Sequence, residues 1–168
     1  MDQSHPDFAI LDPIARGIVN RAGGLAELSL HMPVLIQDAI DFVIDPVRTG
    51  RTRLVELDNV EKTFVGLKVE HFFRDYIDVP KGLRDLQIDG LDVDIKNTVG
   101  NAWTIPPETY RNSEPVLLFM IADALGHCSV GLMVARPDYL RPGANRDAKR
   151  STSAAARQHI YWLVEKEK

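Results

Sequence analysis

The chain has 168 residues, 45% of them hydrophobic, and a formal net charge of −4. This length and apolar content predict a single globular domain over residues 1–168 and exclude a disordered or low-complexity polypeptide. The single cysteine, Cys128, excludes an intrachain disulfide and a cysteine-rich zinc site, and the five histidines show no metal-ligand spacing. We interpret Cys128 as a small packed residue.

The longest apolar run, VLLFMIADAL at residues 116–125, contains Asp123 and is too short to cross a bilayer. The N-terminal sequence MDQSHPDF lacks the basic-then-apolar order of a signal peptide. We therefore expect a cytoplasmic protein without membrane contact. The acidic net charge argues mildly against indiscriminate nucleic-acid binding, although an average charge hides local fields.

The first half of the chain has helical patterns. Apolar residues recur at helical spacing from Pro33 to Ile44, and Asp45-Pro46 ends this segment because a residue before proline avoids the α region. Asp58, with Glu61 three residues later, is a capping-box start for a second helix that runs to about Ile77.

The second predicted helix has one apolar stripe and one acidic residue on its flank. Glu70 lies about 115° from the middle of the stripe at helical periodicity, so we expect it to reach a site at the edge of a sheet. The stripe consists of Val65, Val69, Phe72, Phe73 and Tyr76.

The second half of the chain changes to strand patterns. A short run, WTI at residues 103–105, is stopped by Pro106-Pro107, and two apolar runs at residues 114–124 and 129–137 suit strands that are buried on both faces. We expect a last helix from about Ser151 to Glu165, and the whole pattern predicts an α/β or α+β domain. The apolar stripe of that last helix would be Ala156, Ile160, Leu163 and Val164.

The stretch RDLQIDGLDVDIKN, residues 84–97, is a predicted β-hairpin. Asp89-Gly90 forms its turn, because a type I′ turn needs positive φ at both central residues. A two-residue loop fixes the register, which places Leu86 opposite Val93 and Asp85 opposite Asp94.

The hairpin has one apolar and one polar face, since side chains alternate along a strand. Facing like charges destabilise a hairpin, so we expect a compensating divalent cation, Mg²⁺ or Mn²⁺, both of which accept carboxylate oxygens. The apolar face carries Leu86, Ile88, Leu91, Val93 and Ile95, and the polar face carries Asp85, Gln87, Asp92, Asp94 and Lys96.

A carboxylate, any residue and a lysine form the catalytic signature of many metal-dependent nucleases. About one such tripeptide is expected by chance in a chain of this composition. Two occur, Asp94-Ile95-Lys96 and Asp147-Ala148-Lys149, and only the first lies on a predicted strand with a carboxylate opposite. The second serves as an internal comparison.

These residue types suit phosphodiester cleavage. Carboxylates hold a metal that stabilises charge on the phosphate, and a nearby ammonium orients or helps to deprotonate the attacking water. Asp85, Asp94 and Lys96 supply these groups, and Glu70 would bind the metal or position its water. The alternative is a solvated hairpin face with a surface glutamate.

Several separated motifs, in order, resemble the nuclease domain of the NaeI-type restriction endonucleases over about residues 30–165. The resemblance implies the PD-(D/E)xK restriction-endonuclease fold, a central mixed sheet flanked by helices, and Mg²⁺-dependent cleavage of double-stranded DNA, with Mn²⁺ as a substitute. It also implies an active site of Glu70, Asp85, Asp94 and Lys96. The motifs are EKTFVGLKVE (61–70), DLQIDGLDVDIK (85–96), WTIPPE (103–108), SVGL (129–132), RPGANRDAKR (141–150) and SAAAR (153–157).

Residues 141–153, RPGANRDAKRSTS, form a local basic segment in this acidic chain. It precedes the last predicted helix, whose first backbone N–H groups would suit phosphate, with Ser151, Thr152 and Ser153 as candidate caps. We predict that the segment grips DNA, with Asn145 and Arg146 nearest to base edges; the alternative is a solvated loop. Its cations are Arg141, Arg146, Lys149 and Arg150.

Members of the resembled family carry a second, C-terminal DNA-binding domain, and this chain ends at EKEK, so we expect no such domain here. The resemblance suggests a homodimer. A separate DNA-recognition partner protein is the alternative arrangement.

The sequence thus predicts a type II-like, site-specific deoxyribonuclease of a restriction or repair system. Two alternatives stay open: a catalytically silent DNA-binding or assembly module, and a hydrolase of small phosphoesters. The presence of all four site residues argues against the first, and the basic segment argues against the second.

Overall fold

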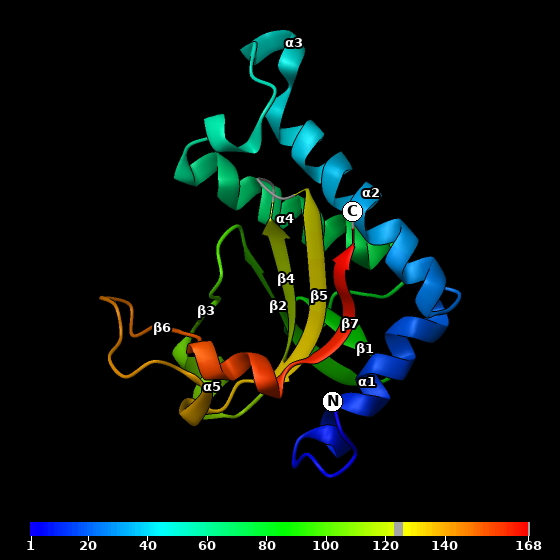
Figure 1. The fold of residues 1–168 in the computed structure, drawn as a ribbon, viewed down its shortest axis with the longest axis vertical. Coiled ribbons are helices and arrows are strands. Elements are labelled where there is room, and N and C mark those ends of the chain that lie inside the picture. The colour runs from blue at the N-terminus through cyan, green and yellow to red at the C-terminus, as the bar shows by residue number, and fades with distance from the viewer. Residues whose placement is uncertain (123–125, 168) are drawn as a thin grey trace.

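A computed structural model describes residues 1–122 and 126–167 (Figure 1). A five-stranded sheet with the order β1-β2-β4-β5-β7 lies at its centre. β2 and β4 run parallel and the other neighbouring pairs run antiparallel, so the sheet is mixed, as predicted. Its strands are β1 (Leu86–Ile88), β2 (Leu91–Thr98), β4 (Pro115–Ala122), β5 (His127–Val134) and β7 (Tyr161–Glu167).

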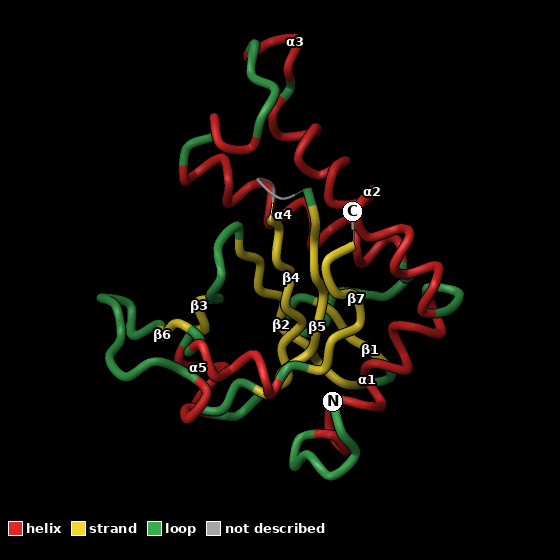
Figure 2. Tube along the Cα trace, viewed as in Figure 1, coloured by secondary structure: helices red, strands yellow, loops and turns green. Residues whose placement is uncertain are grey.

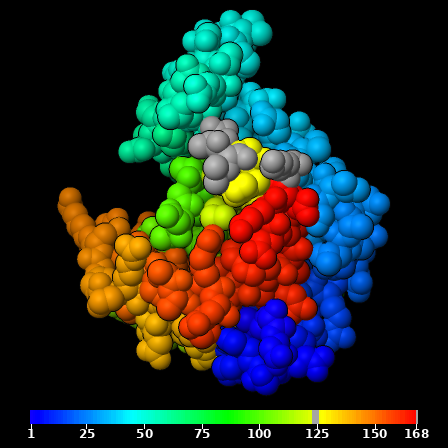
Figure 3. Space-filling view, viewed as in Figure 1, coloured from blue at the N-terminus to red at the C-terminus, as the bar shows by residue number. Residues whose placement is uncertain are grey.

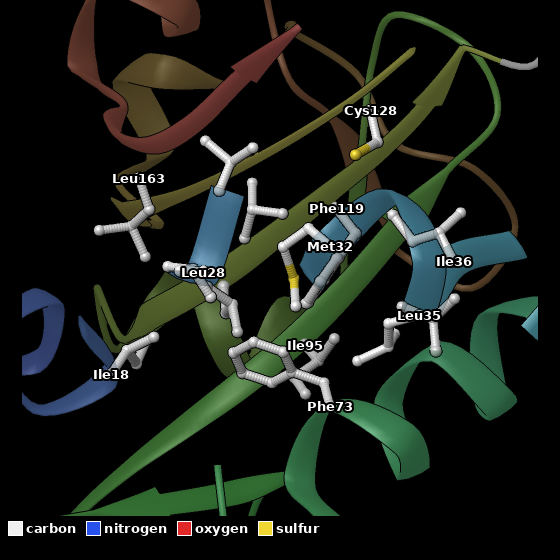
Figure 4. Packing of buried hydrophobic residues seen from close by; sticks show 14 of the residues in the cluster. Ile18, Leu28, Met32, Leu35, Ile36, Phe73, Ile95, Phe119, Cys128 and Leu163 are labelled. Atoms are coloured by element: carbon white, nitrogen blue, oxygen red, sulfur yellow. The ribbon is translucent and has the colours of Figure 1, made fainter. Parts of the chain in front are cut away.

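Three long helices cover one face of the sheet: α1 (Phe8–Arg21), α2 (Leu25–Ile44) and α4 (Asn59–Tyr76). Figure 4 shows Leu28 and Met32 of α2 packed with Phe73 of α4 over Phe119 of β4 and Ile95 of β2. Full burial of such a side chain stabilises the fold by about 1.5–3 kcal/mol. Two short elements, α3 (Pro46–Thr49) and η1 (Leu54–Glu56), connect α2 to α4 at the top of Figure 1.

A second hydrophobic cluster covers the opposite face of the sheet. Trp103, 1% exposed, lies in it and donates its indole N–H to the carbonyl oxygen of Phe119 at 2.9 Å. This layer is built from short elements, seen to the left of the sheet in Figure 2. They are β3 (Thr104–Ile105), which pairs with β6 (Arg150–Ser151), α5 (Pro107–Arg111), and the 3₁₀ helices η3 (Pro137–Tyr139) and η4 (Ala154–His159).

Most local predictions are confirmed. α2 ends at Ile44, and Asp58 caps α4 by accepting hydrogen bonds from two backbone N–H groups of its first turn. The predicted strand over residues 114–124 is observed up to Ala122, and its last two residues lie outside the part of the chain that the structure describes. None of the described helices combines the length and apolarity needed to cross a bilayer.

The predicted last helix is wrong, because residues 154–159 form the 3₁₀ helix η4 and residues 161–167 form strand β7. Tyr161 to Val164 are aromatic or aliphatic residues that suit a strand, and β7 pairs along the edge of β5. The apolar residues read as one stripe fall into two clusters: Ile160 belongs to the second and Leu163 to the first. Short apolar runs do not distinguish a helix from a strand, and here the pairing partner decides.

Candidate functional site

The hairpin of β1 and β2 brings two carboxylates together. Leu86 pairs with Val93, as predicted, and Asp89 and Gly90 have φ values of 49° and 85°, which place both turn residues in the left-handed region. Asp85, one residue before β1, accepts a hydrogen bond from the backbone N–H of Ile95 at 2.7 Å. This contact holds the Asp85 carboxylate beside Asp94, its predicted cross-strand neighbour.

Hydrogen-bond donors from the protein compensate this negative charge. Asp94 is buried, with 6% of its surface exposed, and its Oδ1 accepts from Lys96 Nζ at 2.6 Å. Its Oδ2 accepts from the hydroxyl of Thr109 at 3.0 Å. Burial, followed by the neighbouring Asp85, raises the pKa of Asp94, and the Lys96 ammonium opposes this shift. The sequence prediction named only a cation as the compensating group, whereas the structure supplies an ammonium and a hydroxyl.

Glu70 lies on the flank of α4 and reaches this region through an arginine. Glu70 Oε1 is 2.5 Å from Nη1 of Arg74, and the same nitrogen donates to the backbone oxygen of Asp85 at 2.8 Å. Arg74 therefore lies between Glu70 and the start of the hairpin. A groove of about 470 Å³ borders Glu70 and is lined by α4 and by the end of β2.

The side chains present fit an oxygen-preferring cation only in part. Asp85 and Asp94 are adjacent carboxylates, the donor type that Mg²⁺ and Mn²⁺ accept. Glu70 is engaged by Arg74, and within residues 1–122 and 126–167 no three carboxylate, histidine or cysteine side chains form a metal-binding group. The structure thus joins Asp85, Asp94 and Lys96 directly and joins Glu70 to them through Arg74.

The basic segment is a closed turn on an exposed loop. Asn145 Oδ1 accepts from the backbone N–H groups of Asp147 and Lys149 at 3.0 and 2.9 Å, so this oxygen is already used within the loop. The comparison tripeptide, residues 147–149, lies in this turn, with Ala148 at φ 58°, and not on a strand. It resembles Asp94-Ile95-Lys96 in sequence alone.

The four cations of the segment differ in their surroundings. Arg150 donates to the backbone oxygens of Arg141 and Leu140 at 2.9 and 3.2 Å and lies over the ring of Tyr110, so it braces the base of the loop. The other three, Arg141, Arg146 and Lys149, are exposed. In Figure 3 the orange residues of this segment project from the left of the molecule. A depression of about 360 Å³ there is lined by residues that include Arg141, Asn145 and Lys149.

The helix predicted directly after the basic segment is absent from that position. Arg150 and Ser151 form β6, and the Thr152 hydroxyl accepts from the backbone N–H of Trp103 at 3.0 Å. Ser153 does act as a cap, for the 3₁₀ helix η4. The prediction of a phosphate-binding helix N-terminus at this position is therefore wrong. The positive charge of the segment comes from the side chains of the loop.

The sequence prediction did not include two residues of the site, Arg74 and Thr109. Arg74 follows Glu70 by four residues, which is the helical spacing for an ion pair, so a signal for it was present. Thr109 contacts Asp94 from a separate helix, 15 residues away along the chain, and no local pattern marks it.

Comparison with known proteins shows which family this chain resembles. The family described as restriction endonuclease NaeI matches residues 31–168, a range that includes the hairpin, α5 and the basic segment. Type II restriction enzyme NaeI of Lentzea aerocolonigenes is 30% identical over 131 residues, which cover 77% of this chain and 40% of that enzyme. The chain thus spans less than half the length of this relative. On the extent of these matches, the chain belongs to the NaeI restriction endonuclease family.

Proposed function

We propose that this protein is a Mg²⁺-dependent endonuclease that hydrolyses phosphodiester bonds of double-stranded DNA at specific sites, within a restriction or repair system. The observation that carries the proposal is the contact of Asp94 with Lys96 at 2.6 Å, beside Asp85, on a hairpin inside the family match. The name of the relative, a type II restriction enzyme, supports the same activity.

Asp85 and Asp94 would hold Mg²⁺, with Mn²⁺ as a substitute, and Glu70 would complete the site. The metal would stabilise the charge that develops on the scissile phosphate. Lys96, held by Asp94, orients the attacking water and assists its deprotonation. Water attacks phosphorus in line, leaving 5′-phosphate and 3′-hydroxyl ends, by analogy with the family.

Glu70 has a role that depends on Arg74. In the described structure its carboxylate is neutralised by this guanidinium, so Glu70 positions water or metal only when Arg74 shifts its hydrogen bonds toward Asp85 or toward phosphate. An arginine released in this way would itself be a ligand for the DNA backbone.

DNA would be held by the basic segment. Arg141, Arg146 and Lys149 are exposed cations on one loop, and contacts to phosphate from such residues position DNA without reading its sequence. Arg146 and the amide nitrogen of Asn145 are the groups we assign to base edges, whereas Arg150 supports the loop.

A homodimer that presents two such sites to the duplex would cut both strands, whereas a monomer would more naturally nick one strand. A separate DNA-recognition partner is the alternative. The PD-(D/E)xK fold, the single domain over residues 1–168 and the cytoplasmic location stay predictions from the sequence.

The test is conversion of supercoiled plasmid to nicked or linear DNA with Mg²⁺, using the native protein, Lys96→Ala and Lys149→Ala. We expect Lys96→Ala to abolish cleavage. We expect Lys149→Ala to weaken cleavage and to make DNA binding less steeply dependent on salt, because the loss of one assigned phosphate contact reduces the number of counterions released. Binding to varied plasmids without cleavage by the native protein would instead favour a silent DNA-binding module.

A further inference from the structure

Helix α5 contacts the candidate catalytic carboxylate of Asp94 and the basic loop through two neighbouring residues, Thr109 and Tyr110. Thr109 donates its hydroxyl to Asp94, and Tyr110 donates its hydroxyl to the backbone oxygen of Ala148 at 2.9 Å. Three residues beyond α5, Glu114 accepts two hydrogen bonds from Arg84, which directly precedes Asp85, at 2.9 and 2.7 Å. α5 therefore contacts strand β2 of the hairpin and the loop that we assign to DNA, and Glu114, just after α5, contacts the chain just before β1.

The contact of Thr109 fixes the orientation of the Asp94 carboxylate. Thr109 is 1% exposed, and its hydroxyl lies 3.0 Å from Oδ2 of Asp94. The other oxygen, Oδ1, is held by Lys96 at 2.6 Å. Two donors on two different oxygens define the plane of the carboxylate, and a hydrogen bond to an ionised group is stronger than one between neutral groups.

Hydrogen bonds and two prolines restrain the backbone of α5 at both of its ends. The backbone N–H groups of Thr109 and Tyr110 both donate to the oxygen of Pro106, at 3.1 and 3.2 Å. Pro106 and Pro107 restrict φ at the start of the helix, and Asn112 closes its end by donating to the oxygen of Glu108 at 2.8 Å.

The basic loop is tied to the same helix by two contacts. The backbone oxygen of Ala148 accepts from the Tyr110 hydroxyl, and Ala148 has a φ of 58°, a conformation that residues other than glycine rarely adopt. Arg150 also lies over the Tyr110 ring, 5.5 Å from its centre. A displacement of α5 would therefore move Asp94 and the loop together.

We propose that α5 is a positioning element of the nuclease site, in which Thr109 holds the Asp94 carboxylate in the orientation that binds the metal and Tyr110 places the DNA-binding loop relative to it. The role assigned to α5 rests on the proposed function, whereas the contacts of Thr109 and Tyr110 lie within the protein.

Two substitutions at residue 109 separate positioning from packing. Thr109→Val keeps the shape and removes the hydroxyl, whereas Thr109→Ser keeps the hydroxyl and removes a methyl group. If Thr109 merely fills space, Ser is the more damaging change; if it orients Asp94, Val is. Thermal unfolding of both variants tests whether the fold is retained.

The first readout is Mn²⁺ binding by calorimetry, with the protein alone and with a phosphorothioate duplex that resists cleavage. We expect Thr109→Val to raise the Mn²⁺ dissociation constant by about tenfold or more, the worth of one hydrogen bond to a charged group. Thr109→Ser should stay within about twofold. Equal affinities for Val and native protein, or no Mn²⁺ binding by native protein under either condition, would overturn the proposal.

The second readout is DNA affinity in Ca²⁺ for Tyr110→Phe, which loses the hydrogen bond to Ala148 and keeps the ring under Arg150. We expect weaker duplex binding with an unchanged Mn²⁺ dissociation constant. Unchanged duplex binding would remove Tyr110 from the proposal. A native protein that binds Mn²⁺ but cleaves no DNA would count against the proposed function alone, since the residue 109 comparison does not need turnover.

Discussion

At the scale of single residues, we expect the loss of Arg74 to lower the free energy of unfolding. Its guanidinium joins Glu70 to the backbone of Asp85, and the Arg74 and Glu70 side chains are only 14% and 13% exposed. Removing one partner of a largely buried pair leaves the other charge without compensation.

We predict that Arg74→Ala lowers the free energy of unfolding by about 2 kcal/mol, measured by urea denaturation. The matched control is Arg48→Ala, which removes an exposed pair with Asp45 at 3.6 Å and should change stability by less than about 0.5 kcal/mol. Equal effects of the two variants would show that burial does not strengthen the Arg74 contact.

Cys128 is a second residue at which burial has a measurable consequence, a slow reaction of its thiol. It is 3% exposed, and burial, with a smaller contribution from Glu167, raises the pKa of its thiol to about 11. The reactive thiolate is therefore scarce at neutral pH.

We predict that iodoacetamide alkylates Cys128 at pH 8 at least about 100-fold more slowly in the folded protein than in urea, followed by mass spectrometry. The unfolded protein is its own control, because Cys128 is the single cysteine of the chain. Similar rates in both states would contradict the packed position of the thiol.

Among the elements, α4 shows how a helix start depends on a few backbone hydrogen bonds. Asp58 Oδ1 accepts from the N–H groups of Val60 and Glu61, both at 2.8 Å, and Glu61 accepts in return from the N–H of Asp58 at 2.8 Å. The cap fixes the direction in which α4 carries Glu70 toward the hairpin.

We predict that Asp58→Ala lowers the free energy of unfolding by about 1 kcal/mol, because two helix N–H groups lose their acceptor. Asp58→Asn is the control, since asparagine caps almost as well, and it should cost only a few tenths of a kcal/mol. Urea denaturation of both variants tests this, and an equal loss for Asn and Ala would refute the capping role.

At the scale of the whole molecule, the N-terminal turn is fastened to η4 through two histidines. The backbone N–H of Asp7 donates to Nδ1 of His5, so Nε2 of His5 carries the proton and donates to Nδ1 of His159 at 2.8 Å. His159 also stacks on Tyr139, with ring centres 3.9 Å apart, and its Nε2 faces Gln158. Burial, and next His5, lower the pKa of His159, while Asp7 opposes the shift.

A histidine with a lowered pKa in the folded state contributes stability above its unfolded pKa of about 6.5 and loses it as pH falls through the folded value. We therefore predict that the free energy of unfolding decreases on acidification below about pH 6.5. His159→Gln should flatten this dependence, and His71→Gln, which retains the pair, is the control. An identical pH profile for native protein and His159→Gln would exclude the histidine pair as its source.

The sequence by itself determined the features whose causes lie within a few residues: the Asp89-Gly90 turn, the hairpin register that brings Asp85 to Asp94, the cap of α4 and the end of α2 at Asp45-Pro46. Turn geometry, capping and alternation act locally, so they can be read from residue order.

The tertiary structure alone decided the C-terminal strand and the surroundings of Asp94. Residues 161–167 became β7 because β5 offered an edge to pair with, and Gly131 of β5 leaves room there for the side chain of Ile160. Thr109 reached Asp94 because α5 packs on the second face of the sheet. Such contacts depend on the path of the chain between distant residues, which no local pattern specifies.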